Sequence, residues 1–252
     1  RGRLRRHLAP RAMVLTFPPP SKDPLNTGVK VNNVVGLNQA QAATMLKLQG
    51  HLNSMINPDW INGGARFLRA AFVESAEALE HYGWKWWKKQ TIDLPQVQME
   101  LVDILHFYLS HTIVQAKGDV NAAADALVAD LAGPASVTLD GKSYALASLS
   151  VPELLELIGG LAVCGRASFK LLEQSMTACE MTWNDAYTQY VSKNVLNIFR
   201  QQHGYKEGTY IKIWNGEEDN VVLARLLSQH DASRADFADL LHRDLEAAYS
   251  RL

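Results

Sequence analysis

In the stretch FVESAEALEHYGWKWWKKQ, residues 72–90, acidic side chains lie on what otherwise has the pattern of the buried face of a helix. One helical stripe is formed by residues at steps of four, three and four: Phe67, Ala71, Glu74 and Ala78. Glu77 lies beside this stripe. Since exposed polar faces do not place a carboxylate in line with Phe and Ala, the stretch predicts a core helix that carries two inward carboxylates.

A second acidic pair follows in QVQMELVDILHF, residues 96–107. Its apolar stripe again contains a carboxylate: Val97, Glu100, Ile104 and Phe107, with Asp103 adjacent. If the two helices pack face to face, four carboxylates converge, and each close pair repels by about 3 kcal/mol at ~5 Å and an effective dielectric of roughly 20. Burial adds a desolvation cost. A stable protein would need counter-cations there, and hard oxygen ligands suit Mg²⁺.

Two other interpretations of the acidic pairs stay open at this point. Glu-x-x-Glu also occurs on many solvated helix faces, where it forms no site. A carboxylate-bridged di-iron bundle would use the same kind of helices, but it expects Glu-x-x-His pairs, and here Glu100 is followed at that spacing by Asp103. The spacing of the carboxylates alone does not decide between these alternatives.

The rest of the chain predicts an all-α fold, a helical bundle formed by residues 36–252 as a single domain. Helices are expected over residues 38–57, 65–82, 93–114, 151–180 with possible breaks at Gly159, Gly160 and Gly165, 182–200, and about the last 25 residues. Residues 115–150 are Ala-rich and contain several glycines, and this insertion-like segment is predicted as a short helix and then a loop. GYKEGTYIKIWNGEEDN, residues 204–220, is the one part with strand and turn character.

The N-terminal region has a different character. The prolines in FPPPSKDP exclude a helix, so residues 1–35 are predicted to form an extended arm. The basic run RGRLRRHLAPRA precedes Met13, and we interpret residues 1–12 as non-native to the protein, with a cleavable targeting peptide as the alternative.

The composition of the chain limits which partners and which cellular compartment we expect. The formal net charge of −1 gives no overall field that would draw the chain to nucleic acid or to a membrane surface. No stretch approaches the roughly 18 consecutive apolar residues of a membrane-spanning helix. Two cysteines are too few for a disulfide framework and fit a reducing compartment. We therefore expect a soluble, cytoplasmic protein with neither nucleic-acid nor membrane partners.

ESAEALEHYGWKWWKKQ followed by ELVDILHF resembles the dimeric all-α dUTPases, within the all-α NTP pyrophosphohydrolase superfamily. The resemblance extends to LQGHLNSMINPDW upstream and to KNVLNIFRQQHGYKEGTYIKIWNGEEDN downstream, so it covers most of residues 45–220 in the same order. The Trp-Lys run and the Gly-Tyr-Lys-x-Gly-x-Tyr segment are specific to this family, whereas the paired acidic motifs mark only the superfamily. The arm, residues 115–150 and the C-terminal end carry no resemblance.

The resemblance implies a role for each matching residue. The metal-ligand and catalytic positions are Glu74, Glu77, Glu100 and Asp103. The positions that meet the base and nucleoside are Gln49, Asn53, Trp86, His106 and Phe107. The positions that bind or close over the phosphates and deoxyribose are Lys193, Asn197, Arg200, Tyr205, Lys206, Tyr210, Lys212 and Asn220. Two or three Mg²⁺ ions per site are implied as the cofactor.

The activity implied is hydrolysis of dUTP to dUMP and diphosphate by a homodimer, with dUDP as a second candidate substrate. The residue types fit this chemistry, because cleaving a phosphoanhydride requires neutralised oxygens and a water delivered in line. Glu77 is the candidate base for that water. A related pyrophosphohydrolase acting on another nucleotide such as dCTP, or a non-catalytic binding protein that retains the pocket, remains the alternative.

Overall fold

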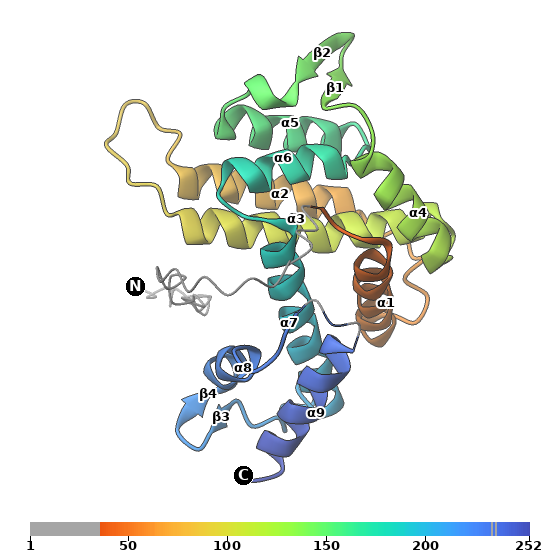
Figure 1. Ribbon diagram of the computed structural model, residues 1–252, viewed down its shortest axis with the longest axis vertical. Helices are drawn as coiled ribbons and strands as arrows, with labels where there is room; N and C mark the ends of the chain where they lie inside the picture. The colour runs from red at the N-terminus through yellow and green to blue at the C-terminus, as the bar shows by residue number, and fades with distance from the viewer. Residues whose placement is uncertain (1–35, 233, 235) are drawn as a thin grey trace, which may run out of the picture.

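The structure, a computed structural model, describes residues 36–252 with the exception of 233 and 235 (Figure 1). The predicted arm, residues 1–35, lies outside the described residues. The helices are α1 (Gln39–Ile56), α2 (Phe67–Tyr82), α3 (Leu94–Gln115), α4 (Val120–Leu131), η1 (Leu146–Ser148), α5 (Val151–Val163), α6 (Phe169–Ala178), α7 (Trp183–Gln202), α8 (Asp219–Leu227) and α9 (Phe237–Tyr249). Two small antiparallel pairs accompany them: β1 (Ser136–Leu139) with β2 (Lys142–Ala145), and β3 (Ile213–Trp214) with β4 (Glu217–Glu218). The fold is all-α, as predicted.

Local signals in the sequence set the helix ends. Asn38 caps α1 in a reciprocal capping box with Gln41, and Thr182 caps α7 through Asp185 in the same way. The carboxylate of Asp93 accepts a hydrogen bond from a backbone N–H in the first turn of α3. The helices predicted over residues 38–57, 65–82, 93–114 and 182–200 are therefore confirmed to within about two residues at either end.

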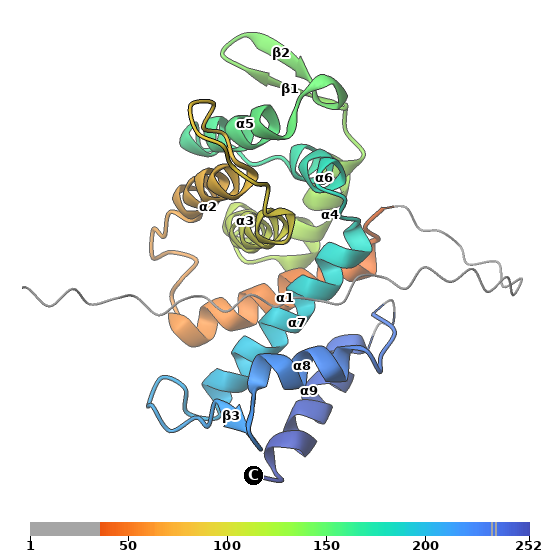
Figure 2. The same ribbon diagram turned by 90° about the vertical axis from the view of Figure 1, so that its left-hand side faces the viewer.

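The helices form two connected groups. In Figures 1 and 2, α2, α3, α5 and α6 stack as one group, with α2 packed against both α3 and α5. The long helix α7 runs from this group to α8 and α9 at the other end of the molecule, and α1 packs across α7 and α4. The middle of α3 and the middle of α7 are in contact where the two groups meet. None of the described helices combines the length and the apolar character that crossing a membrane requires.

The segment that follows α4 differs from the prediction of a loop. SVTLDGKSYA forms the β1–β2 hairpin, with Leu139 paired to Lys142 across the two-residue turn Asp140–Gly141. Both turn residues have positive φ, 49° and 74°, which is the conformation that Asp-Gly hairpin turns adopt. The prediction of a loop was wrong because the Ala-rich composition was given more weight than the Asp-Gly turn and the two short strand-like segments beside it.

The glycines of α5 are a second difference. Residues 151–180 were predicted as one apolar run with breaks, and the chain does break at Gly165, but Gly159 and Gly160 lie within α5. A Cβ on Gly159 would lie 3.0 Å from the Ser75 hydroxyl oxygen of α2. Gly159 therefore permits the close approach of α5 to α2 and does not interrupt the helix.

The turn after α7 carries a stability prediction. Gly204 has φ of 84°, and a Cβ there would lie 1.9 Å from the Thr209 hydroxyl oxygen, whereas Gly208 has φ of 75° with nothing within 4 Å. Each Gly→Ala change costs about 1–2 kcal/mol of left-handed strain, and only Gly204→Ala adds a steric conflict. Thermal denaturation should show a larger fall in Tm for Gly204→Ala than for the matched Gly208→Ala control. Equal falls would contradict the steric part of the prediction.

Candidate active site

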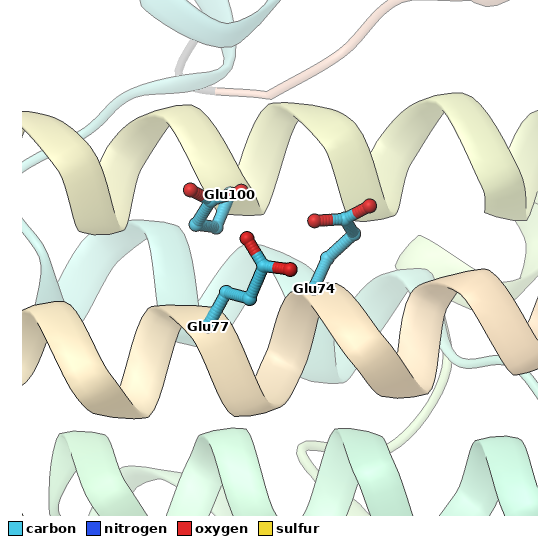
Figure 3. Close-up of side chains that lie close together, drawn as sticks. All are labelled: Glu74, Glu77 and Glu100. Atoms are coloured by element: carbon cyan, nitrogen blue, oxygen red, sulfur yellow. The ribbon is translucent and has the colours of Figure 1, made fainter. Parts of the chain in front are cut away.

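An acidic cluster lies between α2 and α3 (Figure 3). Glu74 and Glu77 extend from α2 and Glu100 from α3, and their carboxylate oxygens approach to within 4.8 Å of one another. Glu100 is buried, Glu74 is half-buried and Glu77 is exposed. The two predicted stripes therefore face each other, and three of the four predicted metal-ligand carboxylates converge.

The electrostatics of the cluster favour a cation. Burial, followed by the charges of Asp103 and its neighbours, raises the pKa of Glu74 from 4.5 to about 7. Burial and Asp103 raise the pKa of Glu100 to about 7 as well, with Glu77 adding to the effect. A proton on this pair relieves part of the repulsion, and a divalent cation would relieve more of it. The donor set, closely spaced carboxylate oxygens from two rigid helices, fits Mg²⁺.

Asp103 is placed one turn further along α3 and faces a different partner. Its Oδ1 accepts a hydrogen bond from the Lys193 ammonium of α7 at 2.5 Å. This ion pair connects the acidic cluster with the helix on which the phosphate-binding residues were predicted. His81, which the sequence analysis did not select, lies with Nε2 3.5 Å from the Glu100 carboxylate. Its position four residues after Glu77 on α2 is the signal that would have found it.

A buried polar network connects α1, α3 and α7 at the predicted base site. Gln49 donates through Nε2 to Asn53 Oδ1 at 3.0 Å, and Asn53 donates through Nδ2 to the Ser110 hydroxyl at 3.0 Å. Gln49 Oε1 lies 2.9 Å from His106 Nδ1. The structure therefore brings together three of the five predicted base and nucleoside residues in one network.

Besides Ser110 of α3, two members of this network on α7 were missed by the sequence analysis. The Tyr190 hydroxyl lies 2.8 Å from Gln49 Oε1, and Asn194 donates to the Tyr190 oxygen at 3.1 Å. Both residues belong to α7 and are fully buried. Their spacing of four residues places them on one face of the helix, next to Lys193, and polar residues on an otherwise apolar face were the available signal.

His106 has a defined protonation state in this network. Burial, with a smaller effect from Lys193, lowers its pKa to about 3, so the imidazole is neutral. Because Gln49 Oε1 is an acceptor, His106 Nδ1 carries the proton and Nε2 is left as an acceptor. Among the described residues no group donates to His106 Nε2, and Asn194 Oδ1 is also buried without a partner. Unpaired buried acceptors of this kind suit a ligand that brings donors.

A cavity of about 220 Å³ lies between α1 and α7. Its lining includes Leu52 and Ile56 of α1, and Asn197, Arg200, Gln201 and Tyr205 of α7 and the turn that follows. Three predicted phosphate-binding residues, Asn197, Arg200 and Tyr205, thus share one wall. Lys193, four residues before Asn197 on the same helix, links this wall to Asp103.

Several side chains after α7 that the resemblance assigns to the phosphates have partners within the protein. The Tyr210 hydroxyl donates to Asp219 at 2.8 Å, and Asn220 accepts from Arg200 at 3.3 Å. The Lys212 ammonium lies 3.7 Å from Glu218. Lys206 is exposed and has no ion pair within the described part of the chain. Tyr210 and Asn220 therefore hold internal partners, and Asp219 was missed because nothing in its sequence context marks it as buried.

The remaining nucleoside positions are less well placed. Phe107 is half-buried and packs against the core. Trp86 is 89% exposed. Its ring centroid lies 5.5 Å from that of Trp87, and the two rings are nearly perpendicular. The loop that carries it projects beyond the ends of α2 and α3 in Figure 1. A single copy of the chain does not bring Trp86 to the base network.

The raised pKa values predict how stability depends on pH when divalent cations are removed by chelation. Glu74 and Glu100 have a folded-state pKa of about 7, against the ordinary value of 4.5 for a glutamate carboxyl in the unfolded chain. The unfolded state therefore loses these protons first, so the chelated protein should lose stability as pH rises from about 4.5 to about 7, by roughly 1–2 kcal/mol since both groups are partly solvated.

Thermal denaturation in chelator across this pH range is the measurement, with Glu100→Gln as the comparison. The variant should show a flatter dependence of Tm on pH, because it removes one of the two coupled groups. Added Mg²⁺ should raise Tm more at pH 7.5 than at pH 5. A wild-type Tm that does not change over this range, or that rises, would contradict the prediction.

The all-α fold, the acidic cluster and the cationic side chains of α7 define a helical enzyme suited to a phosphate chain. A family model described as dUTPase matches residues 41–205, which is well over half of the chain. The chain belongs to this dUTPase family, and the family makes it a dUTP diphosphatase, a hydrolase. The match contains both acidic pairs, the base network and all of α7. No match is found among the curated proteins.

Proposed function

We propose that the protein is a Mg²⁺-dependent dUTP diphosphatase that converts dUTP and water into dUMP and diphosphate, with dUDP as a second candidate substrate. The observation that carries the proposal is the convergence of Glu74, Glu77 and Glu100 within 4.8 Å, opposite a helix that offers Lys193 and Arg200. Paired carboxylates on one wall and cations on the other are what hydrolysis of a phosphoanhydride requires.

The residues that would hold Mg²⁺ are Glu74, Glu77 and Glu100, joined by Asp103 when its Lys193 partner turns to substrate. Mg²⁺ held by these residues would neutralise phosphate oxygens and make a water molecule easier to deprotonate. The raised pKa values of Glu74 and Glu100 support this assignment, because they indicate more negative charge than the cluster tolerates without a cation.

Side chains of the protein account for proton transfer, diphosphate binding and base binding. Glu77 is the exposed member of the cluster, so it is positioned to take the proton of the attacking water. Lys193 and Arg200 donate charge-assisted hydrogen bonds to the diphosphate as it leaves. Gln49, Asn53 and His106 hold the base at the inner end of the site, so the phosphate chain extends towards α7 and the cavity beside it.

A homodimer is part of the proposal. The family resemblance implies it, and several large apolar side chains are exposed on a single copy, among them Phe72 and Val73 of α2 and Ile56 of α1. The exposed Trp86 would then complete the nucleoside site only after assembly or closure. Sedimentation as a monomer at micromolar concentration would contradict this part.

The experiment that tests the proposed function is diphosphate release from a panel of deoxynucleoside triphosphates, measured with Mg²⁺ and with excess chelator. The expected result is Mg²⁺-dependent release with dUTP preferred. Release from dCTP at a similar rate would point to a related enzyme with a different substrate. Release in excess chelator would overturn the metal assignment, and a lack of any release with Mg²⁺ would overturn the activity.

A further inference from the structure

Asp219 is a buried acid that has no part in the acidic cluster. It is the first residue of α8, and its side chain is 0% exposed. A carboxylate so far from water is stable only with charged and hydrogen-bonding partners, so its partners indicate what it does.

Both carboxylate oxygens of Asp219 accept hydrogen bonds from Arg200, which together with Asn197 and Tyr205 forms the wall of the cavity that we call the phosphate wall. Oδ2 accepts from Arg200 Nε at 2.8 Å and from the Tyr210 hydroxyl at 2.8 Å. Oδ1 accepts from Arg200 Nη2 at 2.9 Å. Two parallel bonds between a guanidinium and a carboxylate fix the plane of the guanidinium as well as its distance.

This arrangement leaves one edge of Arg200 for a ligand. Nη2 has a further contact with Asn220 at 3.3 Å, and Nη1 donates to Asn197 Oδ1 at 3.3 Å. Arg200 and Asn197 both line the cavity between α1 and α7. Asp219 thus accepts two of the five N–H donors of Arg200, Asn220 a third and Asn197 a fourth, so one N–H on Nη1 remains for a phosphate oxygen.

The C-terminal helix supports Asp219 through Tyr210. The ring of Tyr210 stacks on that of Tyr249 of α9, with centroids 5.5 Å apart and planes 7° from parallel. The Tyr249 hydroxyl accepts a hydrogen bond from the Ile211 backbone N–H at 3.0 Å. Figure 2 shows α8 and α9 beside the far half of α7. Residues 206–252 lie beyond the family match, so this support belongs to the part of the chain that the match does not cover.

We propose that Asp219 is a positioning residue that orients Arg200 towards the phosphate chain, and that Tyr210 and Tyr249 hold Asp219 and its segment in place. The proposal rests on the proposed function and deepens it, because it names what sets the phosphate wall. It also changes the role of Tyr210, from a phosphate ligand to a support for Asp219. The C-terminal helix α9 then contributes to substrate affinity although it does not line the cavity.

The test compares two probes that differ in whether they carry phosphates. Affinity for inorganic tripolyphosphate with Mg²⁺ is measured by calorimetry, and affinity for deoxyuridine is measured in the same way. Asp219→Asn keeps the shape of the side chain but removes its charge, so tripolyphosphate should bind about 10- to 100-fold more weakly. Deoxyuridine should bind as in the wild type. A change in fold alone would not separate the two probes.

Coupling to Arg200 and a matched control complete the design. Asp219→Asn should cause little further loss of tripolyphosphate affinity in an Arg200→Ala background, because it acts through that arginine. Asp244→Asn is the control, since Asp244 of α9 pairs with His230 at 2.6 Å and has no contact with the wall. It should leave affinity for both probes unchanged.

If Asp219→Asn does not fold, Tyr210→Phe decides the question, because it keeps the ion pair and removes one donor. It should weaken tripolyphosphate binding by about threefold to tenfold. Unchanged tripolyphosphate affinity in the folded variants would overturn the proposal, and so would an equal loss for deoxyuridine or a full loss in the Arg200→Ala background. Because these readouts do not involve turnover, a failure of dUTP hydrolysis is recognised separately from a failure of the positioning role.

Discussion

Glu74→Gln should lower kcat/KM for dUTP by roughly 10³-fold or more, and chelation of divalent cations should abolish turnover. Asp103→Asn should have an effect of the same order, although Asp103 pairs with Lys193 in the structure. The physical reason is that both changes remove negative charge needed to retain the cation beside the phosphates, so stabilisation of several kcal/mol is lost from the transition state.

The matched control for this prediction is Glu80→Gln. Glu80 lies on the same helix, one turn beyond Glu77, but its carboxylate accepts hydrogen bonds from Trp84 and Lys85 outside the cluster. Its substitution should change kcat/KM by no more than about twofold, as expected for an exposed residue. Steady-state kinetics with a titration of Mg²⁺ are the measurement. Loss of activity in Glu80→Gln equal to that in Glu74→Gln would mean that the helix and not the cluster is affected.

The acidic cluster could be predicted from the sequence because helical periodicity fixes which residues share a face. Glu74 and Glu100 each lie in line with buried apolar positions such as Ala71 and Val97, and packing α2 against α3 then brings them together. The distance between the helices was not available from the pattern, so the sequence did not show that Asp103 pairs with Lys193 while its charge still acts on Glu74 and Glu100.

The hairpin and the buried partners were missed for different reasons. The Asp140–Gly141 pair is a hairpin signal in the sequence, but the Ala-rich and Gly-rich residues around it favoured the prediction of a loop. Tyr190 and Asp219 are ordinary residues in their local context, and their importance comes from contacts with Gln49 and Arg200 across the fold. Non-local hydrogen bonds leave no periodic signal, so such residues become visible only when the helices are placed.

The buried polar network around Gln49, Asn53 and His106 predicts a preference for dUTP over dCTP of about 10²- to 10⁴-fold in kcat/KM. Uracil presents an N3–H donor where cytosine presents an acceptor, so the site must offer an acceptor at that edge. His106 Nε2 is a buried acceptor without a partner among the described residues, and the low pKa of His106 keeps it from becoming a donor. Each mismatched buried group costs about 1–3 kcal/mol, and two such losses give the stated range.

Two variants test whether the network reads the base. Asn53→Ala should raise KM for dUTP and reduce the preference over dCTP, because it removes a group at the base and frees the Gln49 amide. Tyr190→Phe should reduce the preference more mildly, since the hydroxyl that holds Gln49 Oε1 is lost while the ring remains. In both variants Mg²⁺ should still raise Tm as in the wild type, because the cluster on α2 and α3 is untouched. Comparable kcat/KM for dUTP and dCTP in the wild-type protein would mean that the same acidic centre serves a different nucleotide, and that the unpaired acceptor of His106 does not select the base.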